Sequence, residues 1–132
     1  PLATLLQRSG VDRWLATPLL AGAAHWTPYG LLVGLYLVTA LLTELVSNQA
    51  AVALIFPVGL SLCQGTGVNA IAAMGVMSFA ASHSFLTPIG YQTNAMVYSV
   101  GNYRLTDFLR LGLPLTTSLC LLTPALALWL WP

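Results

Sequence analysis

The chain has 132 residues, of which 58% are hydrophobic and only 5% are charged, and its formal net charge is +1. A soluble domain carries about 25% charged residues because its surface must be wetted by water. This composition therefore excludes a soluble globular domain and favours a lipid bilayer, and the small, scattered charge excludes a nucleic-acid-binding face.

Residues 11–26 form the first candidate transmembrane helix. Trp14 and Trp26 lie near its two ends, and tryptophan is enriched at membrane–water interfaces. The chain begins at Pro1, with no initiator methionine and no signal peptide. We therefore expect residues 1–132 to be part of a longer protein, whose function needs more than this chain.

Residues 28–63 contain two short apolar stretches separated by a polar break. The break is the tripeptide Ser47-Asn48-Gln49. The second stretch, residues 50–63, would be only about 21 Å long at about 1.5 Å per helical residue. A bilayer core about 30 Å thick needs roughly 20 apolar residues, so this stretch is too short to span it comfortably.

The positions of the arginines favour a re-entrant hairpin for residues 28–63. Arg8 and Arg13 precede the first crossing. Arg104 and Arg110 precede the last one. Both pairs can face the cytoplasm, as arginines near short loops tend to do, only if an even number of crossings lies between them. Two full crossings would also satisfy this count, but they would share a turn of three residues. We favour the hairpin, with its tip near the middle of the membrane.

Residues 68–100 are predicted to form a broken transmembrane helix, and residues 107–131 a continuous one that Thr106 caps. The break falls at Pro88-Ile89-Gly90. Backbone that is not helical is tolerated at membrane depth only where it is buried in protein or lines a cavity. Discontinuous helices mark the binding sites of secondary transporters, so two breaks in one short chain indicate such a site.

The first break combines groups that suit an anion with groups that suit a cation. A second arm that begins at Ser47 and Asn48 leaves the N–H groups of Asn48, Gln49 and Ala50 unpaired, and such groups bind carboxylate or sulfate. The preceding helix leaves carbonyls unpaired near Thr43 and Val46. Together with the Thr43 hydroxyl and the Asn48 amide oxygen, they suit a hard monovalent cation.

The second break supplies a complementary set of groups. Gly90 allows a close approach of the backbone. Thr93 and Asn94 are expected to cap the short helix that follows, with its N–H groups facing the cavity. The alternative is that these polar residues only hold helices together by hydrogen bonds. The presence of two breaks favours a binding site over that alternative.

Two further polar residues have open roles. Glu44 lies one turn before Ser47 and shares its helix face; its carboxylate is expected either to partner a cation or to make a structural hydrogen bond. His83, between Ser82 and Ser84, is expected to pack as a hydrogen-bonded side chain, with a proton relay as the alternative.

These motifs resemble those of the divalent anion:sodium symporter family, which belongs to the ion transporter superfamily and carries the citrate-transporter-like domain. The string from Thr43 to Ala51 is similar to the second hairpin of that family, and residues 84–94 are similar to its second unwound helix. The resemblance covers essentially the whole of residues 1–132. It implies an all-α integral membrane fold, namely the C-terminal half of an inverted-repeat transporter with a re-entrant helical hairpin and an unwound transmembrane helix.

The resemblance also implies the residues of both sites. Sodium would be held, partly by backbone carbonyls, by Thr43, Val46, Asn48 and Gly90. With the polar residues of the second break included, the expected anion-binding set is Ser47, Asn48, Gln49, Tyr91, Thr93 and Asn94.

Two positions depart from the dicarboxylate-transporting members of that family. Gln49 stands where those members usually have threonine, and Tyr91-Gln92-Thr93 stands where they tend to have Thr-Pro-Pro. In these positions the chain looks closer to the broader permease branch, for which sulfate is a common substrate suggestion.

The sequence therefore predicts a secondary active transporter, not an enzyme. The expected reaction is sodium-coupled symport of a divalent anion, either sulfate or a small di- or tricarboxylate such as citrate or succinate. Proton-coupled or antiport anion transport is one alternative, and a non-transporting membrane assembly subunit is another.

The expected surroundings follow from the same reading. Na+ is the coupling ion, and no other cofactor is expected. The partners are the lipid bilayer, an upstream repeat of the same protein and a second copy in a homodimer, without nucleic acid. The expected location is a prokaryotic plasma (inner) membrane.

Overall fold

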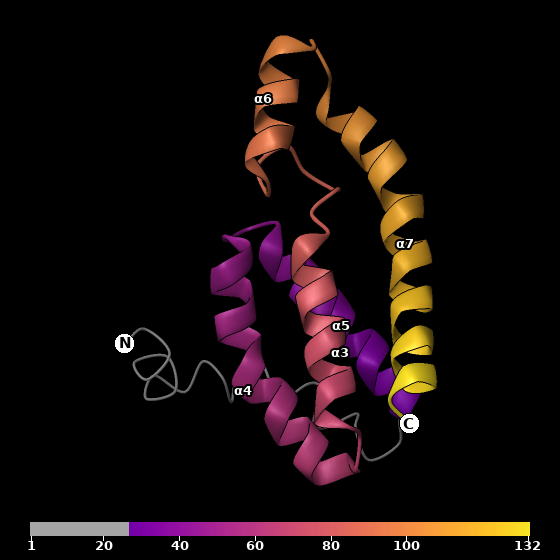
Figure 1. The fold of residues 1–132 in the computed structure, drawn as a ribbon. Coiled ribbons are helices and arrows are strands. Elements are labelled where there is room, and N and C mark those ends of the chain that lie inside the picture. The colour runs from indigo at the N-terminus through magenta and orange to yellow at the C-terminus, as the bar shows by residue number, and fades with distance from the viewer. Residues whose placement is uncertain (1–26) are drawn as a thin grey trace.

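The computed structural model describes residues 27–132, so the predicted crossing at residues 11–26 lies outside the described residues. This part of the chain contains only helices and their connections, and the all-α prediction is confirmed for it. In chain order the helices are α3 (Pro28–Thr43), α4 (Asn48–Thr66), α5 (Ala70–Ser82), α6 (Gln92–Val100) and α7 (Leu105–Leu130), as Figure 1 shows.

Helices α3 and α4 form an antiparallel hairpin, and the short turn between them, residues 44–47, is called the hairpin tip below (Figure 1). Helix α5 packs against both arms of the hairpin and against α7. A second connection, residues 83–91, follows α5 at the same end of the molecule as the tip and leads into α6. We call it the unwound segment. The fold therefore places two irregular segments next to each other.

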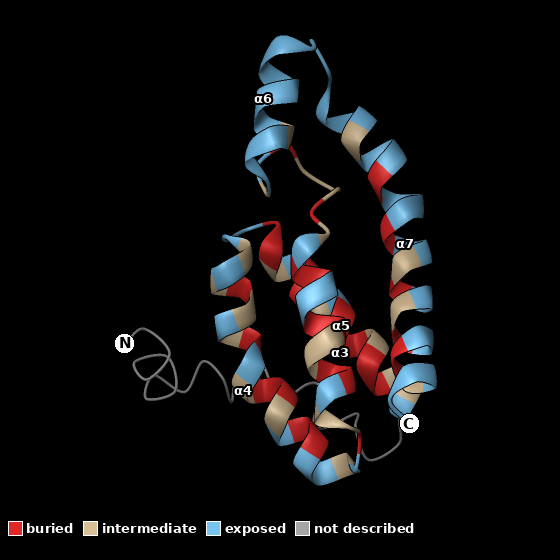
Figure 2. Ribbon diagram, in the orientation of Figure 1, coloured by how far each residue is buried: buried red, intermediate tan, exposed pale blue. Residues whose placement is uncertain are grey.

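The hydrophobic core lies where α3, α4, α5 and α7 face one another, as Figure 2 shows. Its largest fully buried side chains include Tyr36, Leu35 and Met77. Helix α6, by contrast, has no buried residue. The core thus holds one end of each irregular segment in place and leaves α6 outside it.

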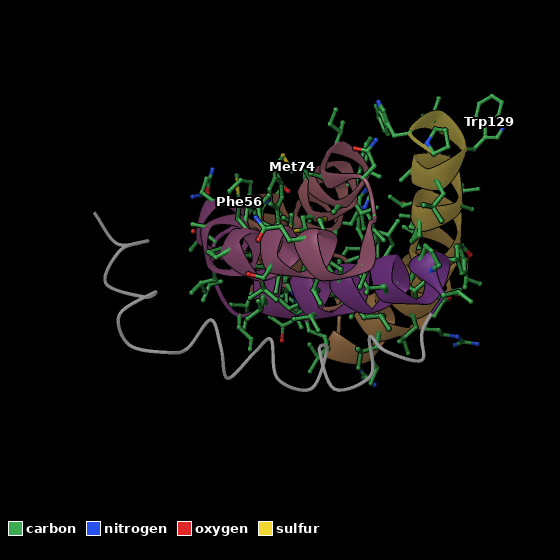
Figure 3. All side chains as sticks on the ribbon, turned by 90° about the horizontal axis from the view of Figure 1, so that it is seen from below. Phe56, Met74 and Trp129 are labelled. Carbon is green, nitrogen blue, oxygen red and sulfur yellow. The ribbon has the colours of Figure 1, made fainter. Side chains whose placement is uncertain are left out.

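Large apolar side chains also cover the outer surface of the described part. Trp129 at the end of α7 and Phe56 on α4 point away from the core in Figure 3, with exposed fractions of 78% and 38%. Among residues 27–132, α4 and α7 are long and apolar enough to cross a membrane by length and composition, whereas α3 and α5 are shorter apolar helices. Such a surface needs apolar surroundings, either lipid or further protein.

Local capping explains where the hairpin helices begin and end. Thr27 accepts a hydrogen bond from the Gly30 N–H at the start of α3, and Ser47 accepts one from the Ala50 N–H at the start of α4. Serine and threonine are favoured at this position because their oxygen satisfies an N–H that the helix leaves unpaired. At the end of α4, Gly67 adopts a left-handed conformation with φ of 72°, which glycine adopts without steric cost.

The prediction that Thr106 caps the last helix is wrong. Helix α7 begins at Leu105, after an extended Arg104, and the Asp107 carboxylate accepts a hydrogen bond of 2.8 Å from the Arg104 N–H. An acidic residue at the third helical position satisfies the N–H of the capping residue. This hydrogen bond places the start of the helix before Thr106.

Replacing Gly112 of α7 with alanine is expected to destabilise the protein, because a Cβ there would contact the Phe85 carbonyl oxygen and lie 2.8 Å from its carbon. Backbone cannot move aside as a flexible side chain does, and overpacking typically costs about 1–3 kcal/mol. The measurement is the thermal midpoint of the purified protein in detergent. Gly75→Ala is the control, since its Cβ would meet only Trp131 at 3.8 Å. Equal midpoints for the two variants would contradict the packing described here.

Candidate functional site

A polar pocket of about 300 Å³ lies between the start of α4 and the start of α6. Its lining comes from both breaks that the sequence singled out, namely Ser47, Asn48, Gln49, Gly90, Tyr91, Gln92 and Thr93. Five of the six predicted anion-binding residues therefore line one pocket. The sixth, Asn94, is not among the lining residues.

Two helix N-termini converge on this pocket. The first hydrogen bonds within the two helices are donated by Ala51 to the Ser47 carbonyl and by Ala95 to the Tyr91 carbonyl. In the described structure, the Ser47 side chain satisfies the Ala50 N–H, while the earlier N–H groups of both helices have no hydrogen-bond partner. Unpaired N–H groups at a helix N-terminus carry partial positive charge and attract anions.

The lining residues of the pocket include no arginine or lysine. Positive potential at the pocket therefore comes from the two helix termini and from neutral donors: the amides of Gln49 and Gln92 and the hydroxyls of Ser47 and Thr93. Within residues 27–132, the groups that could recognise an anion here are hydrogen-bond donors and helix dipoles.

A cluster of oxygen atoms lies directly behind the pocket, on the core side of the tip. The Thr43 hydroxyl is 2.8 Å from Asn48 Oδ1 and 2.9 Å from the Ala81 carbonyl oxygen, and Thr43 is fully buried. A hydroxyl has one proton and can donate to only one of these acceptors at a time. The Thr43 hydroxyl, the Asn48 amide oxygen and the Ala81 carbonyl thus gather at one buried place, and oxygen ligands of this kind suit a hard monovalent cation.

The other predicted sodium-binding residues lie near this cluster. Val46 is in the tip, and its N–H donates to the Leu42 carbonyl. Gly90 approaches the tip so closely that a Cβ on it would lie 3.2 Å from Glu44 Cα. The fold thus brings backbone of the unwound segment next to the residue that follows Thr43.

The prediction that Thr93 and Asn94 cap α6 is wrong. Helix α6 begins at Gln92 after Tyr91, which makes no side-chain capping bond. The Asn94 amide donates instead to the carbonyl oxygens of Ser84, at 2.7 Å, and Thr87, at 3.4 Å. Asn94 therefore ties the unwound segment to α6.

The Glu44 carboxylate makes structural hydrogen bonds, which was one of the two roles expected from the sequence. Its side chain is only 7% exposed. Its carboxylate accepts from the Leu86 N–H at 2.9 Å, from the Thr87 N–H at 3.0 Å and from the Thr87 hydroxyl at 2.6 Å. Thr87 was not singled out from the sequence, because a threonine in a loop gives no local signal of a distant carboxylate.

His83 packs as a hydrogen-bonded side chain, as the sequence predicted. Its Nδ1 lies 3.3 Å from the hydroxyl of the buried Tyr36, and its ring stacks on Phe85. These two contacts hold the first residue of the unwound segment against α3 and Phe85.

A helical protein in which two broken segments face one polar pocket has the architecture of a membrane transporter. The chain belongs to the citrate transporter family, which residues 2–131 match. Together with the relatives described next, this confirms the resemblance to the divalent anion:sodium symporter family and identifies the chain as part of an integral membrane protein.

The chain is 49% identical over 131 residues to an uncharacterized transporter of Synechocystis sp., covering 99% of the chain and 21% of that protein. It is 36% identical over 83 residues to sodium/sulfate cotransporter 1 of Chlamydomonas reinhardtii, covering 63% and 9%. It is 32% identical over 114 residues to solute carrier family 13 member 2 of Mus musculus, covering 84% and 19%. The chain thus spans about a fifth or less of these relatives. No solved structure matches it.

Cysteines placed in the pocket are expected to react with a hydrophilic thiol reagent. In a background without the buried Cys63 and Cys120, Gln49→Cys and Thr93→Cys should label in membranes, because both positions line the polar pocket. Ile55→Cys is the control and should not label, because Ile55 is fully buried. Labelling is measured as a mass shift. Pocket cysteines as unreactive as the one at position 55 would favour tight helix packing over a water-filled site.

Proposed function

We propose that this chain forms part of a secondary active transporter that carries a divalent anion, with sulfate as the leading substrate, together with sodium. The observation that supports this most is the convergence of the N-termini of α4 and α6 on one polar pocket. The activity needs the rest of the transporter, and no covalent chemistry is involved.

The neutral lining favours an anion that stays fully deprotonated. Unpaired backbone N–H groups only donate, and the side-chain amides of the lining can turn their NH2 groups toward the pocket, so the site suits a substrate whose oxygens all accept. Sulfate is compact and presents four acceptor oxygens to donors that converge from two helices. The cotransporters of Chlamydomonas reinhardtii that resemble this chain are named for sodium and sulfate, which supports the same substrate. Citrate is the competing candidate because the family is named for it, and succinate is a smaller anion of the same carboxylate class.

The oxygen cluster supports sodium as the coupling ion. The proposed ligands are the carbonyls near Thr43, Val46 and Gly90, the Thr43 hydroxyl and the Asn48 amide oxygen; the Ala81 carbonyl is a further candidate because it lies 2.9 Å from the Thr43 hydroxyl. Asn48 both contacts this cluster and lines the anion pocket. A cation and an anion so close together attract each other, so the binding of one should strengthen the binding of the other.

We also propose that α3 and α4 form a re-entrant hairpin. At about 1.5 Å per residue, α3 with its 16 residues is about 24 Å long, less than the roughly 30 Å of a bilayer core. The second arm is longer than the sequence indicated, because α4 has 19 residues and is long and apolar enough to cross a membrane, so the proposal rests on the shortness of α3. The tip would then lie within the membrane. An inverted upstream repeat would cover the open side of the pocket, and the homodimer and the plasma (inner) membrane location belong to the same proposal.

The test is uptake by the complete transporter in liposomes. Labelled sulfate should accumulate under an inward sodium gradient, and Asn48→Ala should weaken both sulfate and sodium binding about tenfold or more, because hydrogen bonds to charged groups contribute about 1.5–3 kcal/mol. Succinate tests the competing substrate, and a pH gradient tests proton coupling.

Asn69→Ala is the matched control for this experiment. Asn69 caps α5 through a bond of 2.9 Å from the Ile71 N–H and does not line the pocket, so its loss should lower stability and leave the sodium dependence intact. Sulfate uptake that ignores sodium would contradict the proposal. If Asn48→Ala only reduced the amount of folded protein, the assembly-subunit alternative would be favoured.

A further inference from the structure

The two proposed sites share one geometric feature: each spans the gap between the hairpin tip and the unwound segment. The proposed sodium ligands lie on both sides of this gap, with Thr43 and Asn48 on one side and Gly90 on the other. The anion pocket is likewise lined by the starts of α4 and α6. The width of the gap therefore determines the geometry of both sites.

In the described part of the chain, every hydrogen bond between the tip and the unwound segment ends on the Glu44 carboxylate. Its two oxygens accept from the Leu86 N–H, the Thr87 N–H and the Thr87 hydroxyl. Two further bonds join α3 to this region at the end of α5: Thr43 bonds the Ala81 carbonyl of α5, and the Tyr36 hydroxyl contacts His83, the first residue of the unwound segment. One side chain thus fixes the unwound segment to the tip.

Bonds beyond Glu44 extend this attachment into the sites themselves. The Thr87 hydroxyl, which donates to Glu44, accepts from the Gly90 N–H at 3.2 Å. The Thr87 carbonyl accepts from the Asn94 amide of α6. Hydrogen bonds in such a chain polarise and strengthen one another. The position of the Gly90 backbone and the start of α6 therefore both depend on the Glu44 carboxylate.

We propose that Glu44 is a positioning residue, and that its carboxylate sets the gap on which the affinities for sodium and for the anion both depend. This inference rests on the proposed function. Glu44 touches neither the anion pocket nor the Thr43 oxygen cluster through a hydrogen bond, so it acts through Thr87 and Gly90.

The chemistry of a carboxylate suits this position better than an amide of the same length. An ionised carboxylate only accepts, and here it faces three donors. In Glu44→Gln, one side of the amide would present its own N–H groups to these donors. At least one donor would be left unsatisfied, so the unwound segment should move away from the tip.

The test measures half-saturating sodium and sulfate concentrations for the complete transporter in liposomes. Glu44→Gln is expected to raise both about tenfold, since an unsatisfied buried donor is costly, while the maximal rate at saturating sodium and sulfate changes little. Thr87→Val should raise both by a smaller factor, and Thr87→Ser, which keeps the hydroxyl, should restore them. A residue with only a structural role would lower the amount of folded transporter and leave both concentrations unchanged.

The double variant tests whether Glu44 acts through Thr87. Residues in one network have non-additive effects, so Glu44→Gln combined with Thr87→Val should be no worse than Glu44→Gln alone. The matched control is Thr117→Val on α7, whose hydroxyl bonds only its own helix and whose loss should change neither concentration. Additive effects, or unchanged half-saturating concentrations in both single variants, would overturn the proposal.

A second readout separates this inference from the proposed function. The same four proteins (the wild type, both single variants and the double variant) are compared by thermal midpoint in detergent without sodium or anion. If wild-type uptake ignores sodium, the proposed function is wrong, and the midpoints still test the attachment. If the losses of thermal midpoint are not additive, Glu44 and Thr87 act as one unit. Additive losses would overturn the proposal that Glu44 acts through Thr87.

Discussion

Backbone N–H and carbonyl groups inside a bilayer need partners, because no water is available there to replace a lost hydrogen bond. In the described structure, some backbone N–H groups of the two irregular segments have protein partners and others do not. Glu44 satisfies the N–H groups of Leu86 and Thr87 in the unwound segment. The residues at the starts of α4 and α6 line the polar pocket instead, and the first intrahelical bonds there are donated only by Ala51 and Ala95. The groups left without protein partners are thus gathered at one place, where a bound solute can satisfy them.

The same arrangement gives a physical basis for the proposal that a site lined by neutral residues binds ions. Helix termini supply fixed partial charges whose orientation does not change when the ligand arrives, so little reorganisation is needed. The Thr43 oxygen cluster and the anion pocket share Asn48, which places the proposed cation next to the proposed anion. In this proposal, coupling between the two solutes follows from their proximity, and Glu44 keeps the two sides of the site at a constant distance.

The sequence predicted those features that local chemistry determines. Ser47 begins a helix because its side chain caps the Ala50 N–H, and Pro88 cannot continue a helix, so both breaks were expected. The second break is longer than Pro88-Ile89-Gly90, since α5 already ends at Ser82. The starts of α6 and α7 were misplaced because extended backbone at Tyr91 and Arg104 ends the preceding connections, and neither residue type signals a cap.

The roles that depend on distant contacts could not be predicted. Glu44 bonds backbone N–H groups far along the chain, and any residue but proline carries such a group, so sequence gives no sign of them. The Ala81 carbonyl beside Thr43 is hidden for the same reason. Pairing of this kind is visible only once α5 has packed against the hairpin.

The central claim is that the starts of α4 and α6 face one solute-binding pocket inside the membrane. A cryo-electron microscopy structure of the complete transporter in lipid nanodiscs, with sodium and sulfate, tests it most directly. We expect density for an anion between Ser47-Asn48-Gln49 and Gln92-Thr93, with the hairpin tip at the depth of the lipid tails. A tip in bulk solvent at the membrane surface, with no density between the two helix starts, would contradict the account.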